Sequence, residues 1–519
     1  MPVRPSGRTL RANRRRTDSA LDEVIFEFSA IGNSVKVCAV DPYTGTEVSI
    51  VGPLNAGEAV LRRTALAKLR FVLDRDRPRP MDKPGTFASP VTPVCLSLPG
   101  TREYLSRNAP TGKPDMKYMA AIAAVAIAIA VAVAVFFEED SGPGESARIG
   151  ALMPMTGGLQ VYGQTSLNGV RMAVDEVNAA GGVLGGQLGL DVGDTQTNPQ
   201  SGVDAAKRLV TTDKVSGLVG ALSSGVTIPV ASSVSSVEQV PQVSGASTSP
   251  VVTTLKDNDF LFRTVPSDAL QGVILADLME EKGVTEIGVV YLNNDYGQGL
   301  AEAVEGAFDG KITAMVPFEE KQASYRAELQ KVKDSGAETL VLIAYPGDGI
   351  PILRQALEEQ LFAKFVFTDG MKAQEVVDAI GGNLLEGAYG TAPSADTESA
   401  TAKAFKQLYE TKYGELPPQP FIDAAYDATI LLALAIQKAG SPDGVAVRDA
   451  LRAVSSPPGR KFNPGQFAAA KAALEAGEDI DYDGAAGSQD FDANGDVPGT
   501  YVEWAVRAGS VEDVRLIRP

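Results

Sequence analysis

Between residue 147 and the C-terminus, short apolar segments alternate with longer amphipathic ones, and this rhythm restricts the fold more than any other feature of the chain. In the helix predicted at 163–179, Leu167 and Val170 share one face, and Gly181 stands where the helix should end. Strands are predicted at 149–152, 188–192, 217–222, 239–243, 286–292, 312–318, 339–343 and 365–368, and further helices at 201–211 and 226–237. Strands that alternate with helices predict an α/β fold of βαβ units, with helices on both faces of parallel sheets. Two such runs predict two lobes.

The composition excludes several kinds of chemistry. The 519 residues include no histidine, which removes the commonest general base and the commonest metal ligand. Both cysteines, Cys38 and Cys95, lie in the first quarter of the chain, so neither a disulfide nor a thiolate metal site can form within the large α/β region. We therefore expect no catalytic residues, no metal and no cofactor, and a protein that is not an enzyme.

Charge divides the chain into two parts. Residues 1–117 carry 19 Lys and Arg against 12 Asp and Glu, whereas residues 118–519 carry 28 against 53. An acidic surface of this kind repels nucleic acid, and its simplest interpretation is a well-solvated, soluble domain. No nucleic-acid partner is expected.

A segment without charge separates these parts. Residues 118–137, YMAAIAAVAIAIAVAVAVFF, are twenty uncharged residues, enough to span a bilayer core of about 30 Å as a helix. Basic residues precede the segment and acidic ones follow it, which places the N-terminus in the cytoplasm and the acidic part outside. We interpret 116–140 as a transmembrane helix or a signal peptide, since Ala132-Val133-Ala134 fits a cleavage site. A buried soluble helix is the weaker alternative.

The N-terminal region is predicted to be a separate small α+β domain at 20–75. Strands are expected at 23–28, 34–40 and 46–51, and a helix at 56–73. The phrases GNSVKV and DPYTGTEVSIVGP resemble a small uncharacterised bacterial domain, which implies no particular chemistry. A basic disordered tail is predicted at 1–19 and a proline-rich linker at 76–115.

The α/β region opens with IGALMPMTGGLQVYG at 149–163, a short strand that runs into a glycine-rich turn. This motif and the alternation after it resemble the periplasmic solute-binding proteins that supply branched-chain amino acids to ABC transporters. The resemblance implies a two-lobed type I periplasmic binding fold over 147–519. It places lobe 1 at about 147–265 and 393–495, and lobe 2 at about 266–392 and 496–519.

Small hydroxylated residues follow two of the predicted strands, where ligands of parallel sheets bind. Ser224 follows 217–222 and begins a helix, so its hydroxyl and the free N–H groups there could hold a carboxylate. The alternative is that Ser224 only caps the helix. The resemblance implies that Ser224, Ala246 and Thr248 bind the α-carboxylate of an amino acid.

The resemblance also assigns the opposite wall. Asp369, in FTDG, stands where the family carries the acidic partner of the α-ammonium, and some relatives have the longer Glu there. Tyr296 and Tyr345 match aromatic residues that close over the solute. The alternative for Asp369 is a plain turn residue.

Two aromatic residues are expected to select the solute side chain. Tyr162, in LQVYG, stands where some relatives carry tryptophan, and Phe421, in PQPFIDAAYDA, matches an aromatic residue near the hinge. A core aromatic is the equally weighted alternative for Phe421.

Three motifs carry less weight. The GGVLGG segment at 181–186 follows a helix and lacks the dinucleotide-binding spacing. The DFDANGDVPGTY segment at 490–501 begins like a calcium loop but ends in Tyr501 where Glu is needed, so we predict a turn around Asn494 and Gly495. No GxSxG elbow occurs.

These features predict the extracytoplasmic solute-binding component of an ABC importer, a monomer in its soluble part, that captures a branched-chain or related amino acid and delivers it to a membrane permease. It would lie in the periplasm or on the outer face of a bacterial inner membrane, secreted or anchored by 118–137. The alternative is a membrane-anchored receptor that senses a ligand with the same domain. If two genes were joined or a start codon was assigned early, the binding protein would begin at Met116.

Overall fold

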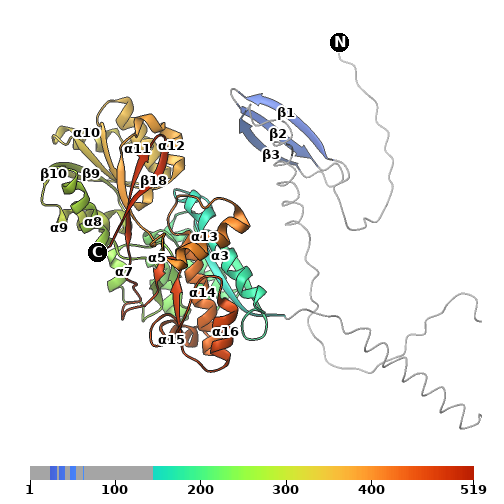
Figure 1. Ribbon diagram of the computed structural model, residues 1–519. Helices are drawn as coiled ribbons and strands as arrows, with labels where there is room; N and C mark the ends of the chain where they lie inside the picture. The colour runs from blue at the N-terminus through green and yellow to red at the C-terminus, as the bar shows by residue number, and fades with distance from the viewer. Residues whose placement is uncertain (1–23, 32–33, 41–46, 54–61, 63–143, 519) are drawn as a thin grey trace, which may run out of the picture. The chain divides into compact units, whose positions relative to one another are not determined.

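The computed structural model describes residues 24–31, 34–40, 47–53, 62 and 144–518 (Figure 1). These residues belong to two units, which are described separately. In the first unit, three antiparallel strands pair in the order β1-β2-β3. Their bounds are Ile25–Ile31, Ser34–Val40 and Glu47–Pro53. The tail at 1–19, the helix predicted at 56–73, the linker at 76–115 and the segment at 116–140 lie outside the described residues, apart from residue 62.

Lobe 1 of the second unit is built on a five-stranded parallel sheet, in the order β5-β4-β6-β7-β8. The strands are β4 (Glu145–Met153), β5 (Gln187–Asp194), β6 (Gly217–Gly220), β7 (Gln242–Ser244) and β8 (Leu261–Arg263). The first four match predicted strands. All residues of β6, β7 and β8 are buried, as expected for strands covered on both faces.

Helices connect these strands. They are α3 (Gln160–Ala179), α4 (Pro199–Thr211), α5 (Ser224–Val230), a π-helical turn η1 (Ala231–Ser235), α6 (Ser236–Glu238) and α7 (Pro250–Thr254). Helix α3 ends as the sequence predicts: Gly181 has a φ of 82°, and the Gly182 N–H donates to the Val177 carbonyl oxygen.

Lobe 2 is built on a seven-stranded sheet, in the order β10-β9-β11-β12-β13-β17-β18. Its strands are β9 (Glu286–Leu292), β10 (Lys311–Phe318), β11 (Thr339–Ile343), β12 (Lys364–Phe367), β13 (Tyr389–Pro393), β17 (Tyr501–Arg507) and β18 (Ser510–Ile517). Its helices are α8 (Asp268–Glu281), α9 (Asp295–Ala307), α10 (Arg326–Asp334), α11 (Pro346–Glu358), η2 (Asp369–Met371), α12 (Gln374–Ile380) and η3 (Gly382–Leu384). The parallel strands β9, β10, β11 and β12 were predicted, but β13, which pairs parallel with β12, was not. Strands β17 and β18 add an antiparallel edge that the βαβ pattern does not predict.

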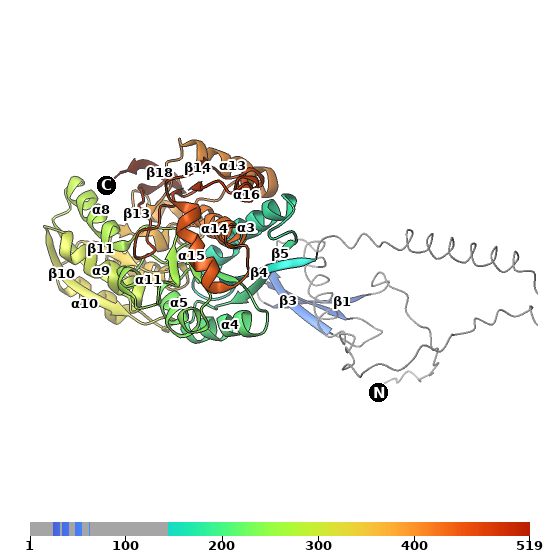
Figure 2. The same ribbon diagram turned by 90° about the horizontal axis from the view of Figure 1, so that it is seen from below.

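The chain passes between the two sheets three times: after β8, after β13 and before β17. After the second passage it builds the rest of lobe 1. These elements are α13 (Ala400–Tyr413), α14 (Ile422–Ala439), α15 (Gly444–Ser455), β14 (Arg460–Phe462), α16 (Phe467–Glu475), β15 (Ile480–Gly484) and β16 (Gly487–Ser488). Figure 2 shows α14 lying between α3 and α15.

Helix α14 forms the centre of lobe 1, because fourteen of its eighteen residues are buried. Its Asp427 carboxylate is buried as well and accepts hydrogen bonds from Tyr482 and from the Ala485 and Ala486 N–H groups. In the described residues, no single helix is both long and apolar enough to cross a bilayer, and only the bent pair α14 and α15 passes by length and composition.

Candidate functional site

A small cavity lies between the two lobes, at the carboxyl ends of the parallel strands. Seven of the eight residues predicted to bind a solute line it. The lining residues are Leu159, Tyr162, Leu222, Ser224, Ala246, Tyr296, Tyr345, Asp369, Gly370 and Phe421. Its volume is about 20 Å³, roughly the room that one water molecule needs. An amino acid can therefore enter only when the lobes separate and the lining side chains move apart.

Direct hydrogen bonds hold the lobes together around the cavity. The Tyr162 hydroxyl of lobe 1 donates to the Asp369 carbonyl oxygen of lobe 2 at 2.8 Å. The hydroxyl oxygens of Ser223 and Tyr345 lie 3.2 Å apart across the same boundary. The structure thus describes a closed arrangement, whose closing contacts use side chains that also line the cavity.

The lobe 1 wall carries neutral polar groups. Ser224 is the first residue of α5, and its Oγ accepts a hydrogen bond from the Ser249 N–H at 3.3 Å. The preceding residue, Ser223, occupies the N-cap position and makes no side-chain capping bond. The interpretation of Ser224 as a helix cap is therefore wrong, and the residue lines the cavity instead.

Thr248 is the one predicted site residue that does not line the cavity. It is 1% exposed, and its hydroxyl donates to the Asp268 carboxylate at 2.8 Å. Because this bond uses the only hydroxyl hydrogen, Thr248 has only lone pairs left for a second partner. The predicted contact of Thr248 with a solute carboxylate stays a prediction.

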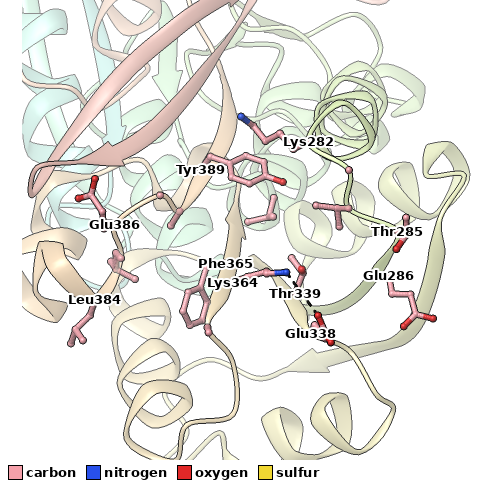
Figure 3. Close-up of a pocket in the computed structure, with 17 residues that line it drawn as sticks. Lys282, Thr285, Glu286, Glu338, Thr339, Lys364, Phe365, Leu384, Glu386 and Tyr389 are labelled. Carbon is pink, nitrogen blue, oxygen red and sulfur yellow. Dashed lines mark ion pairs between the residues drawn. The ribbon is translucent and has the colours of Figure 1, made fainter.

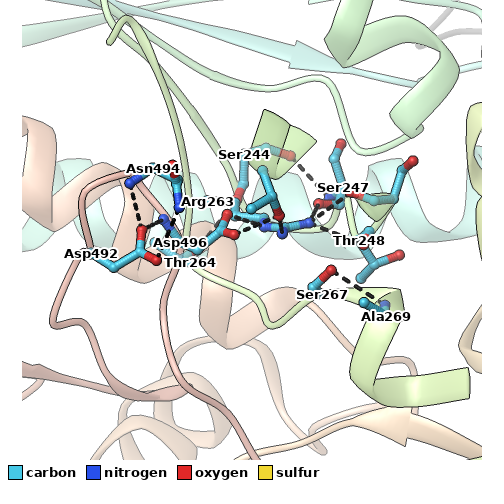
Figure 4. A network of polar contacts seen from close by, with 12 residues as sticks. Ser244, Ser247, Thr248, Arg263, Thr264, Ser267, Ala269, Asp492, Asn494 and Asp496 are labelled. Carbon is cyan, nitrogen blue, oxygen red and sulfur yellow. Dashed lines mark hydrogen bonds and ion pairs between the residues drawn. The ribbon is translucent and has the colours of Figure 1, made fainter. Parts of the chain in front are cut away.

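A buried arginine positions the loop that carries Ala246 and Thr248. Arg263, at the end of β8, is 0% exposed, and its Nη1 donates to the carbonyl oxygens of Ser247, Thr248 and Ser249 (Figure 4). Its Nε donates to Asp496 at 2.7 Å. Through these bonds one side chain connects the cavity wall to the passage before β17.

The same passage contains the turn predicted around Asn494 and Gly495. The Gly495 N–H donates to the Asp492 carbonyl oxygen, and Gly495 has a φ of 77°. Asp492 also accepts hydrogen bonds from the N–H groups of Asn494 and Asp496 (Figure 4). The Asp492 side chain thus stabilises the turn, and the Asp496 side chain forms an ion pair with Arg263.

The lobe 2 wall carries a buried acid. Asp369 follows β12 in η2 and is 3% exposed. Its Oδ1 accepts hydrogen bonds from the Tyr296 hydroxyl at 2.8 Å and from Gln271 Nε2 at 2.9 Å. Burial raises the pKa of Asp369 to about 6, although both bonds favour the ionised form. A cation next to Asp369 would offset this cost of burial.

Aromatic rings form the rest of the wall. The rings of Tyr296 and Tyr345 stack with their centroids 5.2 Å apart, and the ring centroids of Tyr162 and Phe421 lie 6.3 Å apart. Phe421 has a φ of 81°, which is rare for a bulky residue, and it is 5% exposed. It is thus both part of the core and part of the cavity lining. Burial raises the pKa of the Tyr162 and Tyr296 hydroxyls, which keeps both neutral.

The sequence did not reveal Gln271 or the partner of Thr248, Asp268. Both lie among the first four residues of α8, where an acidic residue is common because it interacts favourably with the helix N-terminus. Only their packing against Asp369 and Thr248 distinguishes them. In the described residues, no cluster of three acidic, cysteine or histidine side chains could hold a metal ion.

A larger pocket of about 500 Å³ lies at the opposite end of the lobe 2 sheet (Figure 3). It is formed by the loops that lead into β9, β11, β12 and β13, with Tyr389 and Phe365 at its centre. Solutes of parallel sheets bind at the carboxyl ends of the strands, whereas this pocket lies at their amino ends. We therefore assign the candidate solute site to the small cavity between the lobes.

The fold and the site together define a solute-binding protein, and comparison with known proteins agrees. A family model described as a periplasmic binding protein matches residues 146–494. The chain therefore belongs to the periplasmic binding protein family, and its relatives make it a protein of the branched-chain amino-acid type. This family binds solutes outside the cytoplasm and is not a class of enzymes. Residues 21–76 match a domain of unknown function, DUF6898. Both resemblances expected from the sequence are thus confirmed.

Individual relatives agree with this family. A leucine-, isoleucine-, valine-, threonine- and alanine-binding protein of Pseudomonas aeruginosa is 30% identical over 321 residues, which cover 61% of this chain and 85% of the relative. The chemotactic signal transduction system substrate-binding protein BasB of Halobacterium salinarum is 24% identical over 358 residues, 67% of this chain and 84% of the relative. The crystal structure of the branched-chain amino acid transporter substrate-binding protein LivJ from Streptococcus pneumoniae, in complex with isoleucine, has 26% identity and a TM-score of 0.61, and covers 72% of this chain and 100% of LivJ.

Proposed function

We propose that this protein captures an α-amino acid between its lobes and delivers it to a membrane permease as the binding component of an ABC importer. The observation that carries the proposal is the polarity of the cavity: neutral groups at Ser224 and Ala246 on one wall, and the buried acid Asp369 on the other. A zwitterion matches both walls at once. Names of relatives that bind branched-chain amino acids support the same class of solute.

Capture would begin with the lobes apart. The solute carboxylate would bind lobe 1 near Ser224 and Ala246, and closure about the three passages would bring Asp369 and Tyr345 to the ammonium. Tyr162 and Phe421 would contact the solute side chain. Each charged end of the solute must be paired, because closure removes it from water. No step of this cycle is chemical, so the protein acts without catalysis.

A thermal-shift screen with the common amino acids tests this proposal. A solute that binds only the folded protein raises the melting temperature in proportion to its occupancy, so leucine, isoleucine or valine should give the largest shifts. The control is the same panel on Asp369→Asn, in which the shifts should shrink. If no amino acid moves the melting temperature, the proposed class of solute is wrong.

A receptor is the second candidate, in which the two-lobed domain passes a signal through residues 118–137 to the N-terminal region. The relationship to a substrate-binding protein of a chemotactic signalling system favours it. Immunoblots with antibodies against each end of the chain separate the two proposals. One uncleaved polypeptide in the membrane fraction supports the receptor, and a soluble product that begins beyond residue 118 supports the importer.

A further inference from the structure

A second buried carboxyl group, Asp268, lies behind Asp369, and the proposed function does not use it. Asp268 begins α8 and is 0% exposed. Its Oδ2 accepts the hydrogen bond from the Thr248 hydroxyl at 2.8 Å, and its N–H donates to the Thr248 carbonyl oxygen at 2.7 Å. Its other carboxyl oxygen, Oδ1, is buried without a hydrogen-bond partner.

Gln271 lies on the same helix as Asp268 and is bonded to Asp369. It lies one helical turn after Asp268, and its Nε2 donates to Asp369 Oδ1 at 2.9 Å and to the Thr391 carbonyl oxygen at 3.2 Å. Both partners are acceptors, so the amide nitrogen must face them, and the orientation of the amide is settled by this network. The amide oxygen, Oε1, then points elsewhere, and it too is buried without a partner.

Two buried acceptor oxygens on the same helix, Asp268 Oδ1 and Gln271 Oε1, thus have no hydrogen-bond donor. Asp268 and Gln271 are three residues apart, so their side chains share one face of α8. Two acceptor oxygens cannot bond to each other, and leaving both unpaired is costly in a buried site. One proton on Asp268 Oδ1 removes the charge of this buried carboxyl group and converts its unpaired oxygen from an acceptor into a donor.

The charges around Asp268 favour the protonated form. Burial and the neighbouring Asp369 raise the pKa of Asp268 well above its ordinary value, while the Thr248 bond and Arg263 act in the other direction. Arg263 is the cation facing this site, and its N–H groups are already engaged by Asp496, Thr253 and three backbone carbonyls. The phenols of Tyr296 and Tyr501, which also face the pair, have raised pKa values and stay neutral.

We propose that Asp268 holds a proton in the closed site and that the ammonium group of an incoming solute replaces it, so that each amino acid captured releases one proton. The inference rests on the proposed function and adds a requirement to it. The ammonium pairs with Asp369 and neutralises its negative charge, which together with burial favours the protonated form of Asp268. The Asp268 O–H bond then breaks, its electron pair stays on the carboxylate, and the proton passes to the buffer. A solute without an amine cannot drive this exchange.

Calorimetry on the full-length chain measures the exchange directly. Leucine is titrated at pH 7 in several buffers that differ in ionisation enthalpy, and the slope of the observed enthalpy against that quantity counts the protons released. We expect about one proton per leucine, and hence an affinity that rises about tenfold per pH unit near pH 7. Asp268→Asn should bind leucine with a slope near zero. Asp277→Asn, on the exposed face of the same helix, is the control and should keep the wild-type slope.

Two results would overturn the proposal while leaving solute capture intact: leucine binding without proton release, or an unchanged slope in Asp268→Asn. The amine requirement is tested with 4-methylpentanoate, the leucine skeleton without its amine, which should bind about 10- to 100-fold more weakly and release no proton. Equal affinity and proton release with this acid would contradict the exchange.

A measurement without solute separates this proposal from the proposed function. The infrared difference spectrum of wild-type protein minus Asp268→Asn at pH 7 should contain the C=O band of a protonated carboxyl group. Its absence overturns the buried proton even if leucine binds. If the band is present but no amino acid binds, the proposed function fails instead, and the exchange with it.

Discussion

The two walls of the cavity differ in the charge of their polar groups. On lobe 1 the polar groups are neutral, and the protein itself satisfies many of them: the Ser247 hydroxyl donates to the Leu222 carbonyl oxygen, and Arg263 holds the loop carbonyls. On lobe 2 the main polar group is Asp369, an acid whose burial raises its pKa to about 6. The lobe 1 groups are largely paired within the protein, whereas the buried acid of lobe 2 would be stabilised by a cation. The lobes are therefore not equivalent halves, and under the proposed function they would hold a solute in one orientation.

The largest expected effect tests how far lobe 1 depends on Arg263. Arg263→Met leaves Asp496 and three loop carbonyls without their donor, so the free energy of unfolding should fall by about 3 to 5 kcal/mol. Urea unfolding followed by the fluorescence of the single tryptophan, Trp504, measures it. Lys311→Ala, which removes an exposed ion pair with Glu286, is the control and should cost less than about 1 kcal/mol. Similar losses for both variants would contradict a special role for Arg263.

Charge on lobe 2 should dominate solute affinity. Asp369→Asn removes the charged partner of the ammonium, and leucine binding should weaken by about 1.5 to 3 kcal/mol, or roughly tenfold to a hundredfold. Calorimetry measures this loss, and Asp378→Asn on the exposed side of α12 should not change the affinity. Unchanged binding in Asp369→Asn would remove Asp369 from the site.

The same substitution should stabilise the protein while weakening its binding. The Asp369 pKa is about 6 in the folded protein and about 3.9 in an unfolded chain. Between those values the folded state binds more protons, so this group makes stability fall as the pH rises. At pH 7, the free energy of unfolding of Asp369→Asn should therefore be about 1 to 3 kcal/mol higher than that of wild type. This difference should shrink as the pH falls toward 4. Urea unfolding at both pH values measures this difference in stability. A difference that stays the same at pH 7 and pH 4 would contradict the buried charge.

A neutral group on lobe 1 should contribute least to the affinity for the solute. Ser224→Ala removes one hydroxyl from the cavity, and leucine binding should weaken by about 0.5 to 1.5 kcal/mol. Ser232→Ala, an exposed serine in η1 whose hydroxyl bonds to its own turn, is the matched control. A loss from Ser224→Ala as large as that from Asp369→Asn would remove the asymmetry between the walls.

The sequence predicts most of the parallel core, because a βαβ unit has a recognisable local pattern, but the parallel strands β8 and β13 were not predicted. The strands β9 and β11 match their predicted bounds, and α3 ends at the predicted glycine. The antiparallel strands β17 and β18 were not predicted. They join the sheet from the far end of the chain, and their pairing with β13 depends on a contact that no local pattern encodes.

The residues of the site also divide into those that the sequence predicted and those that it did not. The hydroxylated residues were identified because they follow strand ends, where ligands of parallel sheets bind, and the aromatic residues and Asp369 were identified from the family resemblance. Ser223 was not distinguished from Ser224, since which of the two faces lobe 2 depends on where the helix begins. Asp268 and Gln271 were missed because acidic and amide residues at a helix start have a local explanation.

The alternation of strands and helices was thus determined by the sequence itself, because it follows from local patterns. The two-lobed family and the seven residues of the cavity lining were also found from the sequence, through its resemblance to a known family. Only the tertiary structure decided that the cavity is closed by Tyr162 and Tyr345, that the Thr248 hydroxyl donates to Asp268, and that Gln271 donates to Asp369. These contacts join residues that lie up to 207 positions apart. Their energies depend on burial and on distance across the lobes, which exist only once the chain has folded.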